Sequence, residues 1–163
     1  MEHAMLRKDD AYLYRGIEYF FLKDYDNAIG DFNNALKIRP KSFSALWWKG
    51  ITNVEKENYD LAVIDYTNAL KIRRNNATAY CSRAFVYIKK EDYNRAIADY
   101  TQALEIDPNL AFAYCNRAKV YWRRQGEGDC EQALRDCKQA LKINPDNAEA
   151  VVNRALVWNL GLR

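Results

Sequence analysis

The feature that most constrains this chain is a repeat with a period of 34 residues. Tyr80 and Tyr114 are 34 positions apart, and so are Tyr87 and Tyr121. The segments that contain them, AYCSRAFVY and AYCNRAKVY, are nearly the same string. Periods of roughly 20–50 residues indicate stacked supersecondary units, each of which buries its apolar face against its neighbours. The sequence therefore predicts a stack of repeated units.

Each unit has the pattern of two amphipathic helices. In the first unit Tyr12, Gly16 and Tyr19 are spaced i, i+4, i+7, which places them on one helical face. The second half of a unit repeats the pattern, with small residues such as Ala96 and Ala103 on either side of an aromatic ring. We expect the small residues to let two backbones approach while the large ring fills the space beside them.

These residues make the chain resemble the tetratricopeptide repeat family, whose unit is a helix–turn–helix of 34 residues. The resemblance covers about residues 9–160. It implies an all-α fold, a right-handed α-solenoid of antiparallel helix pairs with about four units and a C-terminal helix. The small residue at motif position 8 is Gly16, Gly50, Ala84, Ala118 and Ala155, and position 24 is Phe32, Tyr66, Tyr100 and Cys137.

The resemblance also sets the expected boundaries. An N-terminal segment, 1–8, precedes a single domain, 9–163. Its predicted units are 9–42, 43–76, 77–110 and 111–147, followed by a terminal helix over 148–160. The fourth unit has three extra residues around RRQGEGDC, which we expect to lengthen the turn between its helices. We expect position 16 to cap the second helix of each unit; its residues are Asp24, Asn58, Asp92 and Asp129.

Charged residues recur with the same period. Position 7 is basic in every unit: Arg15, Lys49, Arg83, Arg117 and Arg154. Position 23 is acidic in every full unit: Asp31, Asp65, Asp99 and Asp136. We interpret this as an ion pair between helices in each layer, either within one unit or to the next. A basic stripe for phosphate is the alternative, but the aspartates would neutralise it.

Several function classes are disfavoured by composition. The net charge of +3 comes from 25 Lys and Arg against 22 Asp and Glu, interspersed, so we expect no nucleic acid partner. No apolar stretch approaches about 18 residues, so we expect no membrane span. The N-terminus lacks the apolar core of a secretory signal, and we therefore expect a cytoplasmic protein.

Catalytic and metal sites are also not expected. The four cysteines form no CxxC pair and His3 is the only histidine, so we predict reduced, buried thiols and neither metal nor cofactor. The repeats contain no histidine, no phosphate-binding glycine loop and no nucleophile beside a plausible base. We do not expect an enzyme.

The resemblance implies that the first helices of the units line a concave groove, which holds an extended peptide or a partner helix. We expect anchors near Trp47, Trp48, Ile51 and Phe85, with the groove becoming polar towards Arg123. The alternative is that these rings pack on neighbouring helices and leave little open surface. The predicted groove residues are Leu13, Ile17, Trp47, Trp48, Ile51, Phe85, Phe112, Asn116, Lys119 and Trp122.

The family's carboxylate clamp for chaperone C-terminal tails is not expected here. It needs Lys and Asn at positions 5 and 9 of one unit, Asn at 6 of the next, and Lys and Arg at 2 and 6 of the third. In every register tested, only Asn116 fits. The favoured function is an adaptor that binds a protein or peptide partner in an apolar groove. The alternative is a self-assembling structural module, a homo-oligomer.

Overall fold

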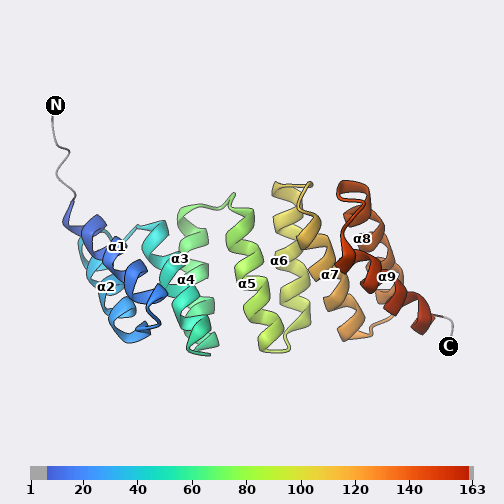
Figure 1. The fold of residues 1–163 in the computed structure, drawn as a ribbon, viewed down its shortest axis with the longest axis horizontal. Helices are drawn as coiled ribbons and strands as arrows, with labels where there is room; N and C mark the ends of the chain where they lie inside the picture. Colours follow the sequence, from blue (N-terminus) through green and yellow to red (C-terminus); the bar gives the residue numbers. More distant parts are fainter. Residues whose placement is uncertain (1–6, 162–163) are drawn as a thin grey trace. The chain divides into compact units, whose positions relative to one another are not determined.

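The computed structural model describes the backbone of residues 7–161 and the side chains of residues 7–157. Within these residues it contains nine helices and no strand, which confirms the all-α prediction (Figure 1). Most of the predicted N-terminal segment, 1–8, lies outside the described residues, and α1 begins at Lys8. The chain divides between Asn75 and Asn76 into two compact units.

Unit 1 contains two antiparallel helix pairs, and unit 2 contains two pairs and a last helix. In unit 1 α1 packs on α2, α3 on α4, and α2 on α3. In unit 2 each helix packs on the next, and α7 also contacts α9. The helices of unit 1 are α1 (Lys8–Phe21), α2 (Tyr25–Ile38), α3 (Phe43–Glu55) and α4 (Tyr59–Ile72). Those of unit 2 are α5 (Ala77–Lys89), α6 (Tyr93–Ile106), α7 (Ala111–Arg124), α8 (Asp129–Ile143) and α9 (Ala148–Gly161).

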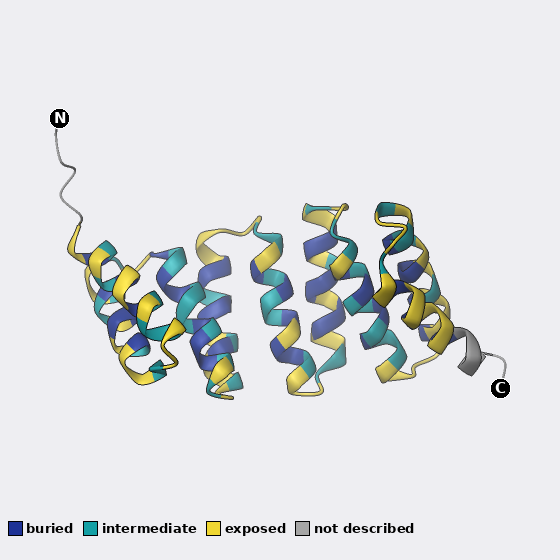
Figure 2. Ribbon diagram, in the orientation of Figure 1, coloured by how far each residue is buried: buried dark blue, intermediate teal, exposed yellow. Residues whose placement is uncertain are grey.

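In both helix pairs of unit 1 a glycine faces an aromatic ring, as predicted. A Cβ placed on Gly16 would lie 2.7 Å from Phe32 Cε1, and one on Gly50 would lie 2.7 Å from Tyr66 Cε1. The buried residues follow the faces where neighbouring helices meet (Figure 2). The alanines at positions 20 and 27 are at most 1% exposed: Ala28, Ala35, Ala62, Ala69, Ala96, Ala103, Ala133 and Ala140.

The turn inside each pair contains a feature that the sequence did not reveal. Lys23, Glu57, Glu91 and Gln125 all have positive φ, between 53° and 60°, and they are 34 residues apart. Glycine usually supplies this left-handed conformation, because other side chains are strained in it. The repeat thus fixes a backbone conformation at positions where no glycine marks it.

The predicted helix caps are confirmed only in part. The side chains of Asp24 and Asp92 accept hydrogen bonds from backbone N–H groups of the first turn of α2 and α6. Asn58 is at the cap of α4, but its side chain makes no cap hydrogen bond. The prediction for Asp129 is wrong: Gly128 caps α8, and Asp129 is the first residue of the helix.

Asp129 has a different role because of the three-residue insertion. Its buried carboxylate accepts hydrogen bonds from the Arg124 guanidinium, at 2.9 and 2.5 Å, and from the Gly126 backbone N–H, at 2.7 Å. The Arg124 bonds, together with the Gly126 N–H, hold the pKa of Asp129 below its ordinary value. The extra residues do not only lengthen the turn: α7 has 14 residues and α8 has 15, against 13 in α5 and 14 in α6.

The repeated charges form ion pairs within each unit of the repeat, which resolves the alternative left open by the sequence. Arg15 donates to Asp31 and Arg117 donates to Asp136, each through two nitrogens at 2.6–2.8 Å. Lys49 pairs with Asp65 at 3.1 Å. The fourth pair joins Arg83 Nη2 to Asp99 Oδ1 at 2.7 Å.

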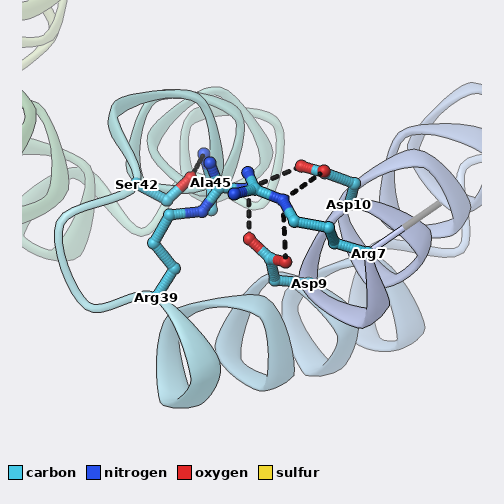
Figure 3. Close-up of polar contacts among 6 residues, drawn as sticks. All are labelled: Arg7, Asp9, Asp10, Arg39, Ser42 and Ala45. Carbon is cyan, nitrogen blue, oxygen red and sulfur yellow. Dashed lines mark hydrogen bonds and ion pairs between the residues drawn. The ribbon is translucent and has the colours of Figure 1, made fainter. Parts of the chain in front are cut away.

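A second group of charges ties the start of α1 to the end of α2. Arg39, which follows α2, pairs with both Asp9 and Asp10 in the first turn of α1 (Figure 3). Arg7 Nε also donates to Asp10, at 3.1 Å. Carboxylates are favourable in the first turn of a helix, because the backbone N–H groups there are unpaired. These ion pairs therefore join the N-terminus of α1 to the C-terminus of α2, at the end of the helix pair opposite its connecting turn.

Three of the four cysteines are buried as predicted, but Cys130 is exposed at the start of α8. Burial raises the pKa of the Cys81 thiol to about 12 and that of Cys137 to about 11. The pKa of Cys115 is also raised by burial. These three thiols are therefore protonated and unreactive near neutral pH.

Candidate protein-binding site

Two adjoining pockets lie on the first helices of the pairs in unit 2. The α7–α9 pocket has a volume of about 190 Å³ and the α5–α7 pocket about 330 Å³. Lys119 and Arg123 line both. The α7–α9 pocket is lined by Ala118, Lys119, Trp122, Arg123, Asn153, Leu156 and Val157. The α5–α7 pocket is lined by Phe85, Ile88, Lys89, Glu91, Tyr93, Asn116, Lys119, Val120 and Arg123.

The helical period explains why apolar and charged side chains meet here. Ala118 and Val157 point into the core and are at most 1% exposed, so they form an apolar floor. Leu156 on α9 and Phe85 on α5 remain 46% and 44% exposed. Large apolar side chains left this open are the usual anchors of a protein interface when they border a pocket.

The cations around the pockets differ in how far they are already paired. Lys119 forms an ion pair with Glu149 of α9. Lys89 lies with its Nζ 5.4 Å from the centre of the Phe85 ring, a cation–π contact. Within the described part of the chain, Arg123 makes neither a hydrogen bond nor an ion pair, and it is exposed.

Two predicted site residues have buried indole N–H groups without a partner. Nε1 of Trp47 and Nε1 of Trp122 make no hydrogen bond to any described residue. An unsatisfied buried donor costs about 1–3 kcal/mol. Buried groups of this kind are uncommon in folded proteins, and both occur at positions that the repeat assigns to the groove.

The structure brings four of the predicted residues together in unit 2. Phe85, Asn116, Lys119 and Trp122 all line one or both pockets. Phe112 is 45% exposed in the first turn of α7 and is not among the lining residues of either pocket. Four of the predicted positions therefore lie at pockets of unit 2, and their role in a binding groove stays a prediction.

The predicted residues of unit 1 are more enclosed. Leu13 is only 9% exposed and belongs to the core with Ala28 and Phe32, so it leaves almost no surface for a ligand. Ile17 and Trp48 are partly buried against the same core. The expected anchors Trp47 and Ile51 are half-buried.

The rings of unit 1 also pack on one another. The Trp48 ring lies 5.5 Å from that of Phe20, 6.0 Å from that of Phe21 and 5.5 Å from that of Trp47, centre to centre. Such edge-to-face pairs stabilise the fold by about 0.5–1.5 kcal/mol each. Much of this aromatic surface is used between neighbouring helices, and Phe21 alone of the four stays 70% exposed.

Sequence reasoning missed Leu156 and Val157. Leu156 has the same motif position in the terminal helix as Ile17, Ile51 and Phe85 in the earlier units. Extending the groove positions into the incomplete fifth unit would have found it. The predicted groove residues all come from the four full repeats.

Comparison with known proteins identifies the repeat. Models described as "Tetratricopeptide repeat" match residues 9–42 and 43–76, and a model described as "TPR repeat" matches residues 86–125. The chain belongs to the tetratricopeptide repeat family. A search of curated protein sequences gave no match.

Solved structures of tetratricopeptide repeat proteins share the fold. A MamA protein has a TM-score of 0.84 at 20% identity, over 93% of this chain and 81% of MamA. YrrB, titled "a TPR protein with an unusual peptide-binding site", has a TM-score of 0.79 at 22% identity, over 91% of this chain and 75% of YrrB. The TPR domain of Arabidopsis OM64 has a TM-score of 0.65 at 28% identity, over 72% of this chain and 94% of the OM64 domain. The fold is an all-α helical repeat solenoid.

The tetratricopeptide repeat fold supports a protein–protein interaction scaffold. None of its described helices is long and apolar enough to cross a membrane. Among the described side chains there is also no group of three His, Cys, Asp or Glu residues placed to hold a metal ion.

Proposed function

We propose that this chain is an adaptor that binds a peptide or helix of a partner protein along α5, α7 and α9, without a carboxylate clamp. The observation that carries the proposal is the pair of adjoining pockets, with an apolar floor and half-exposed anchors. Pockets of this kind orient a ligand by apolar contact and a few polar groups.

The anchors contribute most of the expected affinity. Fully burying a Leu or Phe side chain is worth about 1.5–3 kcal/mol, so covering the open halves of Leu156 and Phe85 yields roughly 1 kcal/mol each. Trp122 adds a large ring at the wall of the α7–α9 pocket. Trp47, Trp48 and Ile51 of unit 1 are partly buried, and the proposed site does not depend on them.

A selection from a phage-displayed library of random 16-residue peptides tests the proposal. The bait is the full chain, and the test variant is Leu156→Asp, which places a charge at the α7–α9 pocket. Val152→Asp is the matched control, because Val152 is on the same helix, 56% exposed, and lines neither pocket.

We expect enriched peptides that bind the wild type and Val152→Asp equally and lose about tenfold or more in affinity for Leu156→Asp. Circular dichroism melting curves show whether both variants remain folded. Peptides that bind all three proteins alike, or a selection that enriches none, would contradict the proposed groove.

Self-assembly is the second candidate, and one observation favours it. Val151 and Val152 of α9 are 44% and 56% exposed, which is an apolar edge on the last described helix. Light scattering over a range of protein concentrations distinguishes the two functions. A self-assembling module grows in mass with concentration and is disrupted by Val152→Asp, whereas a monomeric adaptor shows one mass throughout.

A further inference from the structure

We infer that the groove selects an acidic segment: a partner carboxylate binds between Lys119 and Arg123, beside an apolar side chain in the α7–α9 pocket. Glu149 then acts as an internal competitor for Lys119. The inference rests on the proposed function and specifies the chemistry of its ligand.

Lys119 and Arg123 form the point where the two pockets meet. They are four residues apart on α7, so their side chains leave the same face one turn apart. Both line both pockets. A carboxylate placed there would face an ammonium and a guanidinium at once, and charge-assisted hydrogen bonds of this kind are the stronger class.

The neighbouring arginines of α7 are not available for a ligand. Arg117 is held by Asp136 and also donates to Thr101 Oγ1 at 2.9 Å. Arg124 is held by Asp129 and donates to Asn94 Oδ1 at 2.8 Å. Arg123 has no such partner among the described residues, so its guanidinium keeps its full hydrogen-bonding capacity.

The charges that face the site leave a cationic excess. Lys89, Lys119 and Arg123 line the pockets together with one acidic residue, Glu91. Glu149 adds a second carboxylate through its pair with Lys119. This excess favours an anionic segment and disfavours a basic one.

Glu149 makes the selection competitive. The side chains of Lys119 and Glu149 are 41% and 43% exposed, and exposed pairs of this kind are weak. A ligand carboxylate can therefore replace Glu149 at little cost, after which Lys119 is shared with the ligand. Removing the Glu149 charge should raise affinity for acidic ligands and leave neutral ones unaffected.

This arrangement differs from the clamp that the family uses for C-terminal carboxylates. Lys119 and Arg123 stand at motif positions 9 and 13 of the fourth unit. Position 9 is also a clamp position, but the clamp needs Asn there, and position 13 is not part of the clamp. The other clamp positions of the same unit, 2, 5 and 6, are Phe112, Cys115 and Asn116. The inferred site therefore accepts an internal Asp or Glu side chain and does not need a chain end.

The test uses a peptide from the library selection, synthesised in its natural form and with every Asp and Glu replaced by Asn and Gln. Fluorescence anisotropy measures the Kd of each for the full chain and for Arg123→Gln, Glu149→Gln and Lys138→Gln. Lys138 is an exposed residue on α8 that lines neither pocket, so its variant controls for the loss of one positive charge.

We expect about tenfold weaker binding for the amide peptide and about five- to tenfold weaker binding for Arg123→Gln. Glu149→Gln should bind the acidic peptide about two- to threefold more tightly, and Lys138→Gln should bind like the wild type. Raising the salt concentration should weaken only the acidic peptide.

The outcomes separate this inference from the proposed function. The inference is overturned, while the groove stands, if the selected peptides are neutral or basic and Leu156→Asp abolishes their binding. The same holds if acidic peptides bind Arg123→Gln as tightly as they bind the wild type. Peptides that Leu156→Asp does not affect would overturn the groove itself, and the inference with it.

Discussion

Adding one methyl group at Gly16 or at Gly30 should change the stability of unit 1 in opposite directions. Both glycines belong to the first helix pair, Gly16 in α1 and Gly30 in α2. Alanine is favoured over glycine within a helix by about 1 kcal/mol. A Cβ on Gly30 meets no atom within 4 Å, so Gly30→Ala should gain this full amount.

Gly16→Ala gains the same propensity but creates a clash. Its Cβ would lie 2.7 Å from Cε1 and 2.9 Å from Cδ1 of Phe32, where ordinary contact begins at 3.4 Å. Phe32 is 0% exposed, so its ring has no free space to enter. Overpacking of this kind costs about 1–3 kcal/mol. The net effect is a loss of about 1 kcal/mol, about 2 kcal/mol below Gly30→Ala.

Urea denaturation followed by circular dichroism at the helix band measures the two free energies of unfolding. Because both substitutions lie in one helix pair, they report on the same transition. The double variant Gly16→Ala, Phe32→Leu should behave better than the sum of its parts, since leucine removes the atoms that clash. If Gly16→Ala stabilises unit 1 as much as Gly30→Ala does, the account of its packing is wrong.

Three further measurements address other parts of the fold. A thiol reagent should label one cysteine per native chain, Cys130, and all four after unfolding; faster labelling of a second site would contradict the burial described. Arg117→Met should destabilise unit 2 by about 3–5 kcal/mol because it leaves Asp136 buried without its partner, whereas Arg135→Met, in an exposed pair, should cost under about 1 kcal/mol. In an NMR carboxyl titration Asp136, whose pKa is raised by burial, should protonate above pH 3.8, and Asp129, whose pKa is lowered by Arg124, below it. The stability due to Asp129 is therefore complete above pH 3.8 and lost as the pH falls through its folded pKa, and the reverse order of titration would refute this.

The repeat made most of the fold predictable, because one local pattern recurs in register along the chain. The motif predicts that the small residue at position 8 faces the ring at position 24, and the structure confirms this for Gly16 with Phe32 and for Gly50 with Tyr66. The charge pattern predicted the ion pairs, but it left open whether a partner lies in the same repeat, as Asp65 does for Lys49. Spacing along a sequence does not distinguish a partner helix from the next helix in the stack.

The sequence was least informative where the chain departs from the motif. Asp129 fits the cap position by alignment, yet the insertion moves it into the helix and gives it Arg124 as a partner. The turn residues with positive φ, such as Lys23, are not glycines, so the sequence does not indicate their left-handed conformation. Both features depend on local backbone geometry, which the type of a single residue does not specify.

For the candidate site, the sequence predicted which residues belong to the groove positions but not how far their side chains are exposed. Phe85 and Trp48 both occupy motif positions assigned to the groove, 9 and 6, but Phe85 stays 44% exposed beside a pocket while Trp48 packs on Phe20. Whether a ring lines a surface or fills a contact depends on the volumes of its neighbours. That information lies in the packing of several helices rather than in the motif.

Site-specific photo-crosslinking tests the central claim, that α5, α7 and α9 bind a partner protein, most directly. Benzoylphenylalanine is incorporated at Phe85, which lines the α5–α7 pocket, or at Ile64 of α4, which is 54% exposed and lines neither pocket. After illumination in the cells that produce the chain, gel mobility and mass spectrometry identify the adducts. The account predicts an adduct with a partner polypeptide at Phe85, abolished by Leu156→Asp, and none at Ile64. An adduct that forms at Ile64 but not at Phe85 would contradict it.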